Sequence, residues 1–277
     1  MKILISADME GATAVTHPGD VLPGTPGWER MRPVFTGDVN AVLAGLRDGT
    51  AVVPLVNEAH WSMRNLLLEQ LDAEAEMITG RHKELSMMEG VQDPEVAGVV
   101  FLGYHAGAGS EGVLAHTYLA NTVTSVWLNG VRASEGRLNA AVAAEYGVPV
   151  IMVTGDDKTI EDARGYAPDA VGVAVKHYVS RYTARCLTPE TTARLLREGA
   201  KAAKALAVRH EPVRQGPYRI EIEFDAEHLV GAAEVIPGVA RSGERRVAFE
   251  TPTMYEAIRC FKAVTTIASA AMEEQYG

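Results

Sequence analysis

The sequence has few of the features that mark secreted, membrane or nucleic-acid-binding proteins. Only two of its 277 residues are cysteines, Cys186 and Cys260, so no disulfide framework beyond one bridge and no cysteine-rich metal site can form. No apolar run approaches the roughly 18 residues of a membrane span. The longest basic run is the pair Arg245–Arg246, and 36 acidic residues face 26 basic ones, which argues against a nucleic-acid partner.

The composition that remains is that of a globular protein. Hydrophobic residues make up 47% and charged residues 22%, which excludes a disordered chain, and the net charge is −10. The N-terminal segment has an apolar run too short for a signal peptide, and acidic residues follow it at once. We therefore expect a cytoplasmic protein with two buried, reduced thiols.

Short apolar runs rich in β-branched residues alternate with helical patterns over the first 210 residues. This alternation predicts an α/β domain at residues 1–210, with a mostly parallel sheet flanked by helices. The segment Arg209–Pro217 carries prolines, a glycine and charges, and is interpreted as a linker. Residues 211–277 then predict a small C-terminal α+β domain. No internal repeat is present.

The individual elements follow from apolar periodicity and from start and stop residues. The predicted strands are Lys2–Ala7, Ala51–Asn57, Val96–Gly103, Val113–Ala120, Pro149–Thr154, Val171–Val175, Tyr218–Phe224 and Arg245–Glu250, together with a hairpin that turns at Asn129–Gly130. The predicted helices are Thr36–Arg47, Met63–Leu71, Leu138–Tyr146, Asp156–Arg164, Pro189 to about Val208, and Pro252 to about Gln275.

Polar residues recur where the predicted strands end. In open α/β sheets the functional crevice lies at the carboxyl ends of the strands. Some polar residues come directly after a predicted strand, and others lie at the start of the next helix. These residues are Asp8, Glu10, Glu58, His60, His105, Glu135, Asp156 and Asp157. So many carboxylates and histidines at equivalent positions indicate one converging site.

A metal site is the chemistry that such a set favours. Asp, Glu and His without Cys suit divalent zinc or manganese. Three carboxylates (Asp8, Glu10 and Glu135) and two neutral imidazoles (His60 and His105) would bring three negative charges to two cations, leaving one charge for a bound hydroxide. That arrangement is typical of two-metal hydrolases, in which the hydroxide attacks the substrate.

Simpler explanations exist for each residue. A strand-end Asp or Glu often only caps the next helix, which is our interpretation of Asp156 and Asp157. Glu58 is expected to support the site without binding metal. His116, in an apolar segment, is either a hydrogen-bonded core residue or an acid/base or oxyanion-stabilising group beside the metals. The remaining histidines are expected at the surface: His17, His82, His177, His210 and His228.

One motif imitates a nucleotide site. Gly107–Gly112 spells GxGxxG after a predicted strand. The third glycine of a dinucleotide fingerprint opens a helix, but here a β-branched segment follows. We therefore interpret these glycines as a flexible loop beside the site.

Taken together, the motifs resemble the zinc-dependent D-aminopeptidases associated with bacterial dipeptide-transport operons. The resemblance extends over essentially the whole chain. The blocks that carry it are Asp8–Gly11, Val56–His60, Phe101–Ala106, Gly112–His116, Glu135–Ala140, Val153–Asp157 and Ser180–Pro189. The family commonly has Asp and Ser before its second-block histidine, where this chain has Glu58 and Ala59. That departure removes no ligand and bears on specificity.

The resemblance implies a dinuclear zinc site. Asp8 would bridge two ions, Glu10 and His105 would complete one, and His60 and Glu135 the other, with Mn²⁺ as a possible substitute for Zn²⁺. His116 matches the family's proposed catalytic histidine. The resemblance also implies a ring-shaped homo-oligomer, a decamer, that acts on short peptides with a free N-terminus, D-alanyl peptides in particular.

The sequence thus predicts a metallo-aminopeptidase in which one zinc ion binds the free amine and polarises the scissile carbonyl. A different di-metal hydrolase on the same scaffold, an amidase or a phosphoesterase, is the nearest alternative. A non-catalytic oligomeric protein that binds metal or peptide is a third. Neither nucleic acid nor membrane is expected as a partner.

Overall fold

The computed structural model describes residues 1–49, 51–214 and 216–273. Its larger sheet has seven strands in the order β3-β2-β1-β4-β7-β8-β9, and all neighbours are parallel except β8 and β9. The strands are β1 (Lys2–Ala7), β2 (Val53–Glu58), β3 (Glu76–Ile78), β4 (Val96–Leu102), β7 (Val150–Asp156), β8 (Val171–Ser180) and β9 (Thr183–Cys186). The predicted α/β class with a mostly parallel sheet is confirmed.

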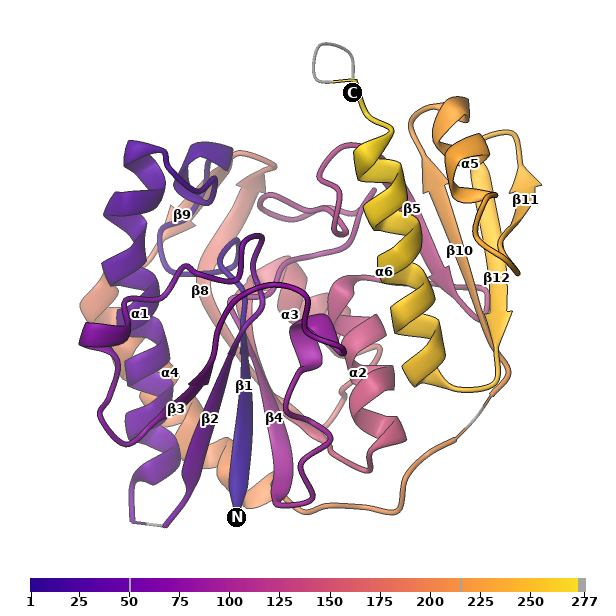
Figure 1. Ribbon diagram of the computed structural model, residues 1–277. Coiled ribbons are helices and arrows are strands. Elements are labelled where there is room, and N and C mark those ends of the chain that lie inside the picture. The colour runs from indigo at the N-terminus through magenta and orange to yellow at the C-terminus, as the bar shows by residue number, and fades with distance from the viewer. Residues whose placement is uncertain (50, 215, 274–277) are drawn as a thin grey trace.

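Helices cover both faces of this sheet (Figure 1). The helices are α1 (Pro26–Arg47) and α4 (Pro189–Ala203), which pack on each other and on one face, and α2 (Glu135–Glu145) and α3 (Asp157–Ala163), which contribute to the core on the other. β1 is buried on both faces, as its continuous apolar sequence requires. Its carboxyl end, between β2 and β4, is therefore fixed from all sides.

A second, antiparallel sheet has the order β11-β12-β10-β5-β6. Its elements are β5 (Val123–Leu128), β6 (Val131–Arg132), β10 (Tyr218–Phe224), β11 (Ala240–Gly243), β12 (Arg246–Thr251), α5 (Glu227–Ala233) and α6 (Met254–Ala270). α6 stands between the two sheets (Figure 1). Because β5 and β6 come from the middle of the chain, this unit is not built from residues 211–277 alone, and the domain limits given above remain a prediction.

The hairpin at Asn129–Gly130 is confirmed, with both residues at positive φ (50° and 78°), as a type I′ turn requires. The predicted start of the first helix at Thr36 is wrong. α1 begins at Pro26, where the Thr25 hydroxyl accepts a hydrogen bond from Trp28 N, and it continues through Pro33. Burial of one face of the helix outweighs the hydrogen bond that this proline removes.

Two predicted elements are absent from the described structure, and carboxylates explain both. Instead of a helix, the 63–71 segment forms turns and a short 3₁₀-helix, because Glu58 accepts hydrogen bonds from the backbone of residues 65 and 66. The 113–120 segment is an irregular loop and not a strand. The Asp156 carboxylate binds Val113 N and the Glu135 carboxylate binds Tyr118 N, in place of ladder partners.

Smaller differences concern the ends of elements. α4 ends at Ala203 and is followed by the 3₁₀-helix Lys204–Leu206, short of Val208. α6 ends at Ala270, and the predicted end near Gln275 lies outside the described residues. β3, β9 and β11 were not expected from the sequence. No helix in the described ranges is long and apolar enough to cross a membrane.

Candidate metal centre

All six predicted site residues line one cavity of about 610 Å³. Asp8 and Glu10 follow β1, His60 follows β2 and His105 follows β4, while Glu135 is the first residue of α2. His116 comes from the irregular loop that replaces the predicted strand. The carboxyl ends of adjacent parallel strands thus supply most of the site, as expected for this fold.

The predicted ligands are almost fully buried and lie within a few ångströms of one another. His60 Nδ1 lies 2.8 Å from Glu10 Oε2 and 3.4 Å from Asp8 Oδ1. His105 Nε2 lies 3.3 Å from Asp8 Oδ2 and 3.6 Å from Glu135 Oε1. Asp8 therefore lies between the two histidines, the position that a bridging ligand needs.

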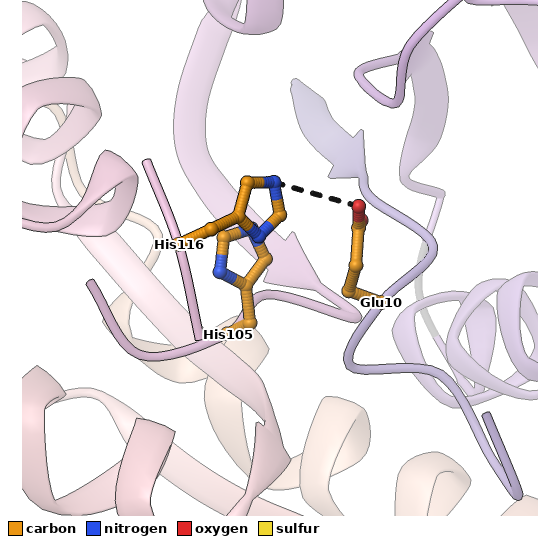
Figure 2. Close-up of side chains that lie close together, drawn as sticks. All are labelled: Glu10, His105 and His116. Carbon is orange, nitrogen blue, oxygen red and sulfur yellow. Dashed lines mark ion pairs between the residues drawn. The ribbon is translucent and has the colours of Figure 1, made fainter. Parts of the chain in front are cut away.

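His116 lies beside this group. Its Nε2 is 3.6 Å from Glu10 Oε1, the ion pair drawn in Figure 2, and 4.0 Å from Glu135 Oε1. Its ring is stacked on that of His105, with centroids 4.1 Å apart and an interplanar angle of 6°. The structure thus places His116 at the ligand cluster and not in a separate part of the core.

Two glycines allow the ligand-bearing loops to approach so closely. Gly11 N donates to Gly103 O at 2.7 Å, and Asp8 N donates to Leu102 O at 2.9 Å. A Cβ on Gly11 would lie 1.9 Å from Tyr104 O, and one on Gly103, whose φ is +68°, would lie 2.1 Å from Asp8 O. Any larger residue at either position would push Asp8 and His105 apart.

Backbone carbonyls orient the three imidazoles. Nε2 of His60 lies 2.8 Å from Val21 O, Nδ1 of His105 lies 3.0 Å from Ala106 O, and Nδ1 of His116 lies 2.8 Å from Leu114 O. A carbonyl can only accept, so these nitrogens carry protons. When a ring is neutral, its other nitrogen is therefore the one with a lone pair for a cation, the arrangement found around metal-binding histidines.

The donor set fits a divalent cation. Three buried atoms that face the cluster, Asp8 Oδ2, Glu10 Oε2 and His105 Nε2, make no hydrogen bond, which would be costly without a positive charge to satisfy them. Groups of three potential ligand atoms within 4.8 Å of one another are Asp8–Glu10–His60, Asp8–His105–Glu135 and Glu10–His105–His116. Asp8 belongs to two of these groups.

The electrostatics of the cluster show a strong demand for positive charge. Burial opposes ionisation of Asp8, but His105 and His60 outweigh it and hold the pKa of Asp8 well below its usual value. Burial likewise opposes protonation of His105, but Glu135 and Asp8 raise its pKa to about 10. For His116, burial and the charge of His105 dominate and lower the pKa to about 4. Either protons on the imidazoles or bound metal ions can supply the positive charge that balances the carboxylates, and a metal ion that binds displaces the protons.

The other strand-end carboxylates support the loops, as expected. Glu58 accepts three hydrogen bonds from Asn65 and Leu66, and Asn65 in turn donates to the backbone of His60. Asp156 caps α3 by accepting from Thr159 N, and its second oxygen accepts from Val113 N in the loop that carries His116.

Lys176 is a supporting residue that the sequence analysis missed. This fully buried side chain of β8 donates from Nζ to the backbone carbonyls of Glu10 (2.6 Å), Ala12 (3.0 Å) and Val15 (2.6 Å). Burial lowers its pKa to about 8. The sequence feature that indicated this role is a lysine that follows a run of apolar residues in β8, because a lysine side chain is buried only where hydrogen-bond partners surround its charge.

Several other expectations can be compared with the structure. His82, predicted to be a surface residue, is exposed but lines the rim of the cavity. The GxGxxG motif is followed by no helix, so the nucleotide fingerprint is absent. Tyr118 was also overlooked: it lines the cavity, and its buried hydroxyl makes no hydrogen bond.

Comparisons with known proteins agree with the geometry. A family profile named Peptidase_M55, described as D-aminopeptidase, matches residues 1–263. A D-aminopeptidase of Bacillus subtilis (strain 168) is 35% identical over 271 residues, which cover 97% of this chain and 98% of that protein. A solved structure described as Zn-dependent D-aminopeptidase DppA from Bacillus subtilis, a self-compartmentalizing protease, superimposes with a TM-score of 0.92 at 34% identity, covering 99% of this chain and all of the other.

Proposed function

Because the chain belongs to the Peptidase_M55 family of D-aminopeptidases, we propose that it is a dinuclear zinc aminopeptidase that releases N-terminal residues, D-alanine in particular, from short peptides. The observation that carries the proposal is the buried cluster of carboxylate and imidazole groups, whose potential ligand atoms lie within 4.8 Å of one another in groups of three. Such a set needs cations, and a cavity that opens beside it gives a substrate access.

Asp8 would be shared by the two ions. The resemblance implied that Glu10 and His105 hold one ion and His60 and Glu135 the other, but the distances group the residues differently. Glu10 and His60 would hold one ion, and His105 and Glu135 the other. The lone pairs of His60 Nδ1 and His105 Nε2 support these roles, since carbonyl oxygens hold the opposite nitrogens. Bound zinc supplies a Lewis acid for the scissile carbonyl and lowers the pKa of water to near neutrality. Manganese accepts the same ligands and could replace zinc.

His116 would act on the reacting peptide bond. Its Nδ1 is occupied by Leu114 O, so Nε2 is the atom that faces the cavity. The lowered pKa of His116 keeps its ring neutral at pH 7 when a metal cation, and not a proton, balances the negative charge of the carboxylates. A neutral Nε2 can take a proton from attacking water and return it to the departing amine, which is general acid–base catalysis.

The metal centre also suits the substrate's free amine. With Glu10 and Glu135 holding zinc, one ion would bind the free amine of the substrate in its neutral form. Peptides blocked at the N-terminus lack this lone pair, and the enzyme should therefore act from the end of the chain and not within it.

A ring-shaped homo-oligomer, a decamer, completes the proposal. Its support is the similarity over the full length to a protease described as self-compartmentalizing. Sedimentation velocity on the purified protein measures the subunit number directly, and a monomer at micromolar concentration would contradict this part.

The catalytic proposal is tested on one sample. The protein is purified without added metal, its ions are counted by elemental mass spectrometry, and hydrolysis of D-Ala and L-Ala p-nitroanilides is followed before and after chelation. We expect about two zinc ions per chain and chelator-sensitive release from the D-amide. Cleavage of the L-amide alone would overturn the stereospecificity. Cleavage of p-nitrophenyl phosphate with neither amide would favour a phosphoesterase, and metal without turnover would favour a binding protein.

A further inference from the structure

The cavity at the metal centre is also lined by three basic residues, Arg81, Lys83 and Lys262. Arg81 and Lys83 belong to the loop after β3, and Lys262 lies on α6, so segments far apart in the sequence bring the three cations to one cavity. Lys262 Nζ donates to Lys83 O at 2.7 Å, which joins α6 to that loop.

These three cations lack acidic partners. Across residues 1–49, 51–214 and 216–273, no carboxylate lies within ion-pair distance of any of them, whereas Arg259 on the same helix is paired with Glu84. Burial lowers the pKa of Lys262, and it lowers the pKa of Lys83 to about 8, although the charge of Glu89 opposes the shift in both. Cations that line a cavity without an ion pair can attract an anion into it.

The cavity suits a molecule with a free amine and a carboxylate. A zinc ion would bind the amine, and the cations that line the same cavity would bind the carboxylate. A short peptide carries both groups, one at each terminus. A planar carboxylate also suits the guanidinium of Arg81, which can bind it through two parallel hydrogen bonds.

We propose that Arg81 and Lys262 bind the C-terminal carboxylate of the substrate, so that the enzyme selects short peptides by reading both termini. This inference rests on the proposed aminopeptidase function and adds a specificity site to it. Lys83 contributes charge, but its Nζ is already bonded to Asn57 Oδ1 at 2.6 Å and to Glu58 O, so it is assigned no direct contact. A substrate too long to place both termini, or one whose carboxylate is blocked, loses this interaction.

The test compares D-alanyl-D-alanine with its C-terminal amide, which differ only in the carboxylate. For the zinc-loaded wild type we expect kcat/KM to be about ten- to a hundred-fold higher for the free acid, the factor that one or two charge-assisted hydrogen bonds provide. Arg81→Gln and Lys262→Gln should each lower kcat/KM for the acid about tenfold more than for the amide. Arg259→Gln is the matched control, because that cation is paired and does not line the cavity.

Lys262→Arg should restore the preference for the acid, because it keeps the charge. Equal turnover of acid and amide by the wild type would overturn the proposal, as would an equal loss on both substrates in the variants, which would indicate a merely structural role. A binding measurement separates this proposal from the proposed function, because it does not depend on turnover. Calorimetry on the His116→Ala variant should show that the free acid binds more tightly than the amide, even if the wild type hydrolyses neither peptide. Equal affinities for the two peptides would refute the carboxylate site.

Discussion

Replacement of Lys176 by methionine should destabilise the loop that carries the metal ligands. The side chain keeps its volume but loses the ammonium that satisfies three buried carbonyls between Glu10 and Val15. A hydrogen bond to a charged group contributes roughly 1.5–3 kcal/mol. Against this stands the burial of the charge, which lowers the pKa of Lys176 from 10.5 to about 8 and costs about 3 kcal/mol. For three such bonds the net loss in unfolding free energy is therefore about 1.5–6 kcal/mol.

The same change should weaken zinc binding. Lys176 touches no ligand atom, but it fixes the backbone of Glu10 directly. Loss of such an outer contact typically costs about 10- to 100-fold in metal affinity. Competition with a chromogenic chelator measures this affinity on folded protein, and urea unfolding of the metal-free protein measures the stability.

Lys201→Met provides the comparison for both measurements. Lys201 is exposed on α4 and pairs with Asp48 at 2.9 Å on the surface, so its loss should change stability by less than about 0.5 kcal/mol. If Lys176→Met were as stable as Lys201→Met and bound zinc as tightly as the wild type, the assignment of Lys176 to the support of this loop would be refuted.

Four further outcomes are expected. His116→Ala should retain zinc and lose about 10²–10⁴-fold in kcat, and elemental analysis showing zinc lost in parallel with activity would count against its catalytic role. Burial raises the pKa of Asp38 from 3.8 to about 6, so the unfolded chain loses that proton first, and wild-type stability should fall by about 3 kcal/mol between pH 4 and 6. In Asp38→Asn that decline should disappear from urea titrations at these pH values. Glu58→Gln keeps one acceptor and gives up another, so the unfolding free energy should drop by about 1–3 kcal/mol, and an unchanged melting curve would contradict its role in holding the loop after β2. Chelation of the zinc-loaded protein should lower Tm by roughly 10 °C in calorimetry, because bound metal stabilises only the folded chain.

The central sheet could be predicted from the sequence because its strands are apolar on both faces. Runs such as Lys2–Ala7 and Val96–Leu102 have no other stable location than the middle of a parallel sheet. The rule that sites form where such strands end gave eight residues, and five of them line the cavity. Which of them pair was not predicted, because the grouping of His105 with Glu135 depends on where α2 begins and not on the strand order.

The loops around the site could not be predicted in the same way. The 63–71 segment has helical apolar spacing, but the distant carboxylate of Glu58 takes its backbone donors. The 113–120 segment has the composition of a strand, but Glu135 and Asp156 hold it in an irregular path with Leu114 at positive φ. Contacts between residues far apart in the sequence overrode local propensity in both cases. The basic residues that line the cavity could not be recognised from the sequence for the same reason, because Lys262 contacts Lys83 only in the folded chain.

The antiparallel sheet takes its strands from the middle and from the C-terminal part of the chain, and this determines when, during synthesis, the protein becomes complete. β5 is made in the first half of the chain, yet its neighbour β10 emerges from the ribosome only later, when Ile220 can pair with Leu128. Until then β5 presents an open edge, a common starting point for association between nascent chains. The cavity wall formed by Lys262, Thr265 and Ser269 arrives later still. A truncated translation product that ends before α6 would therefore carry the metal ligands without an enclosed cavity, and would neither select nor confine a peptide.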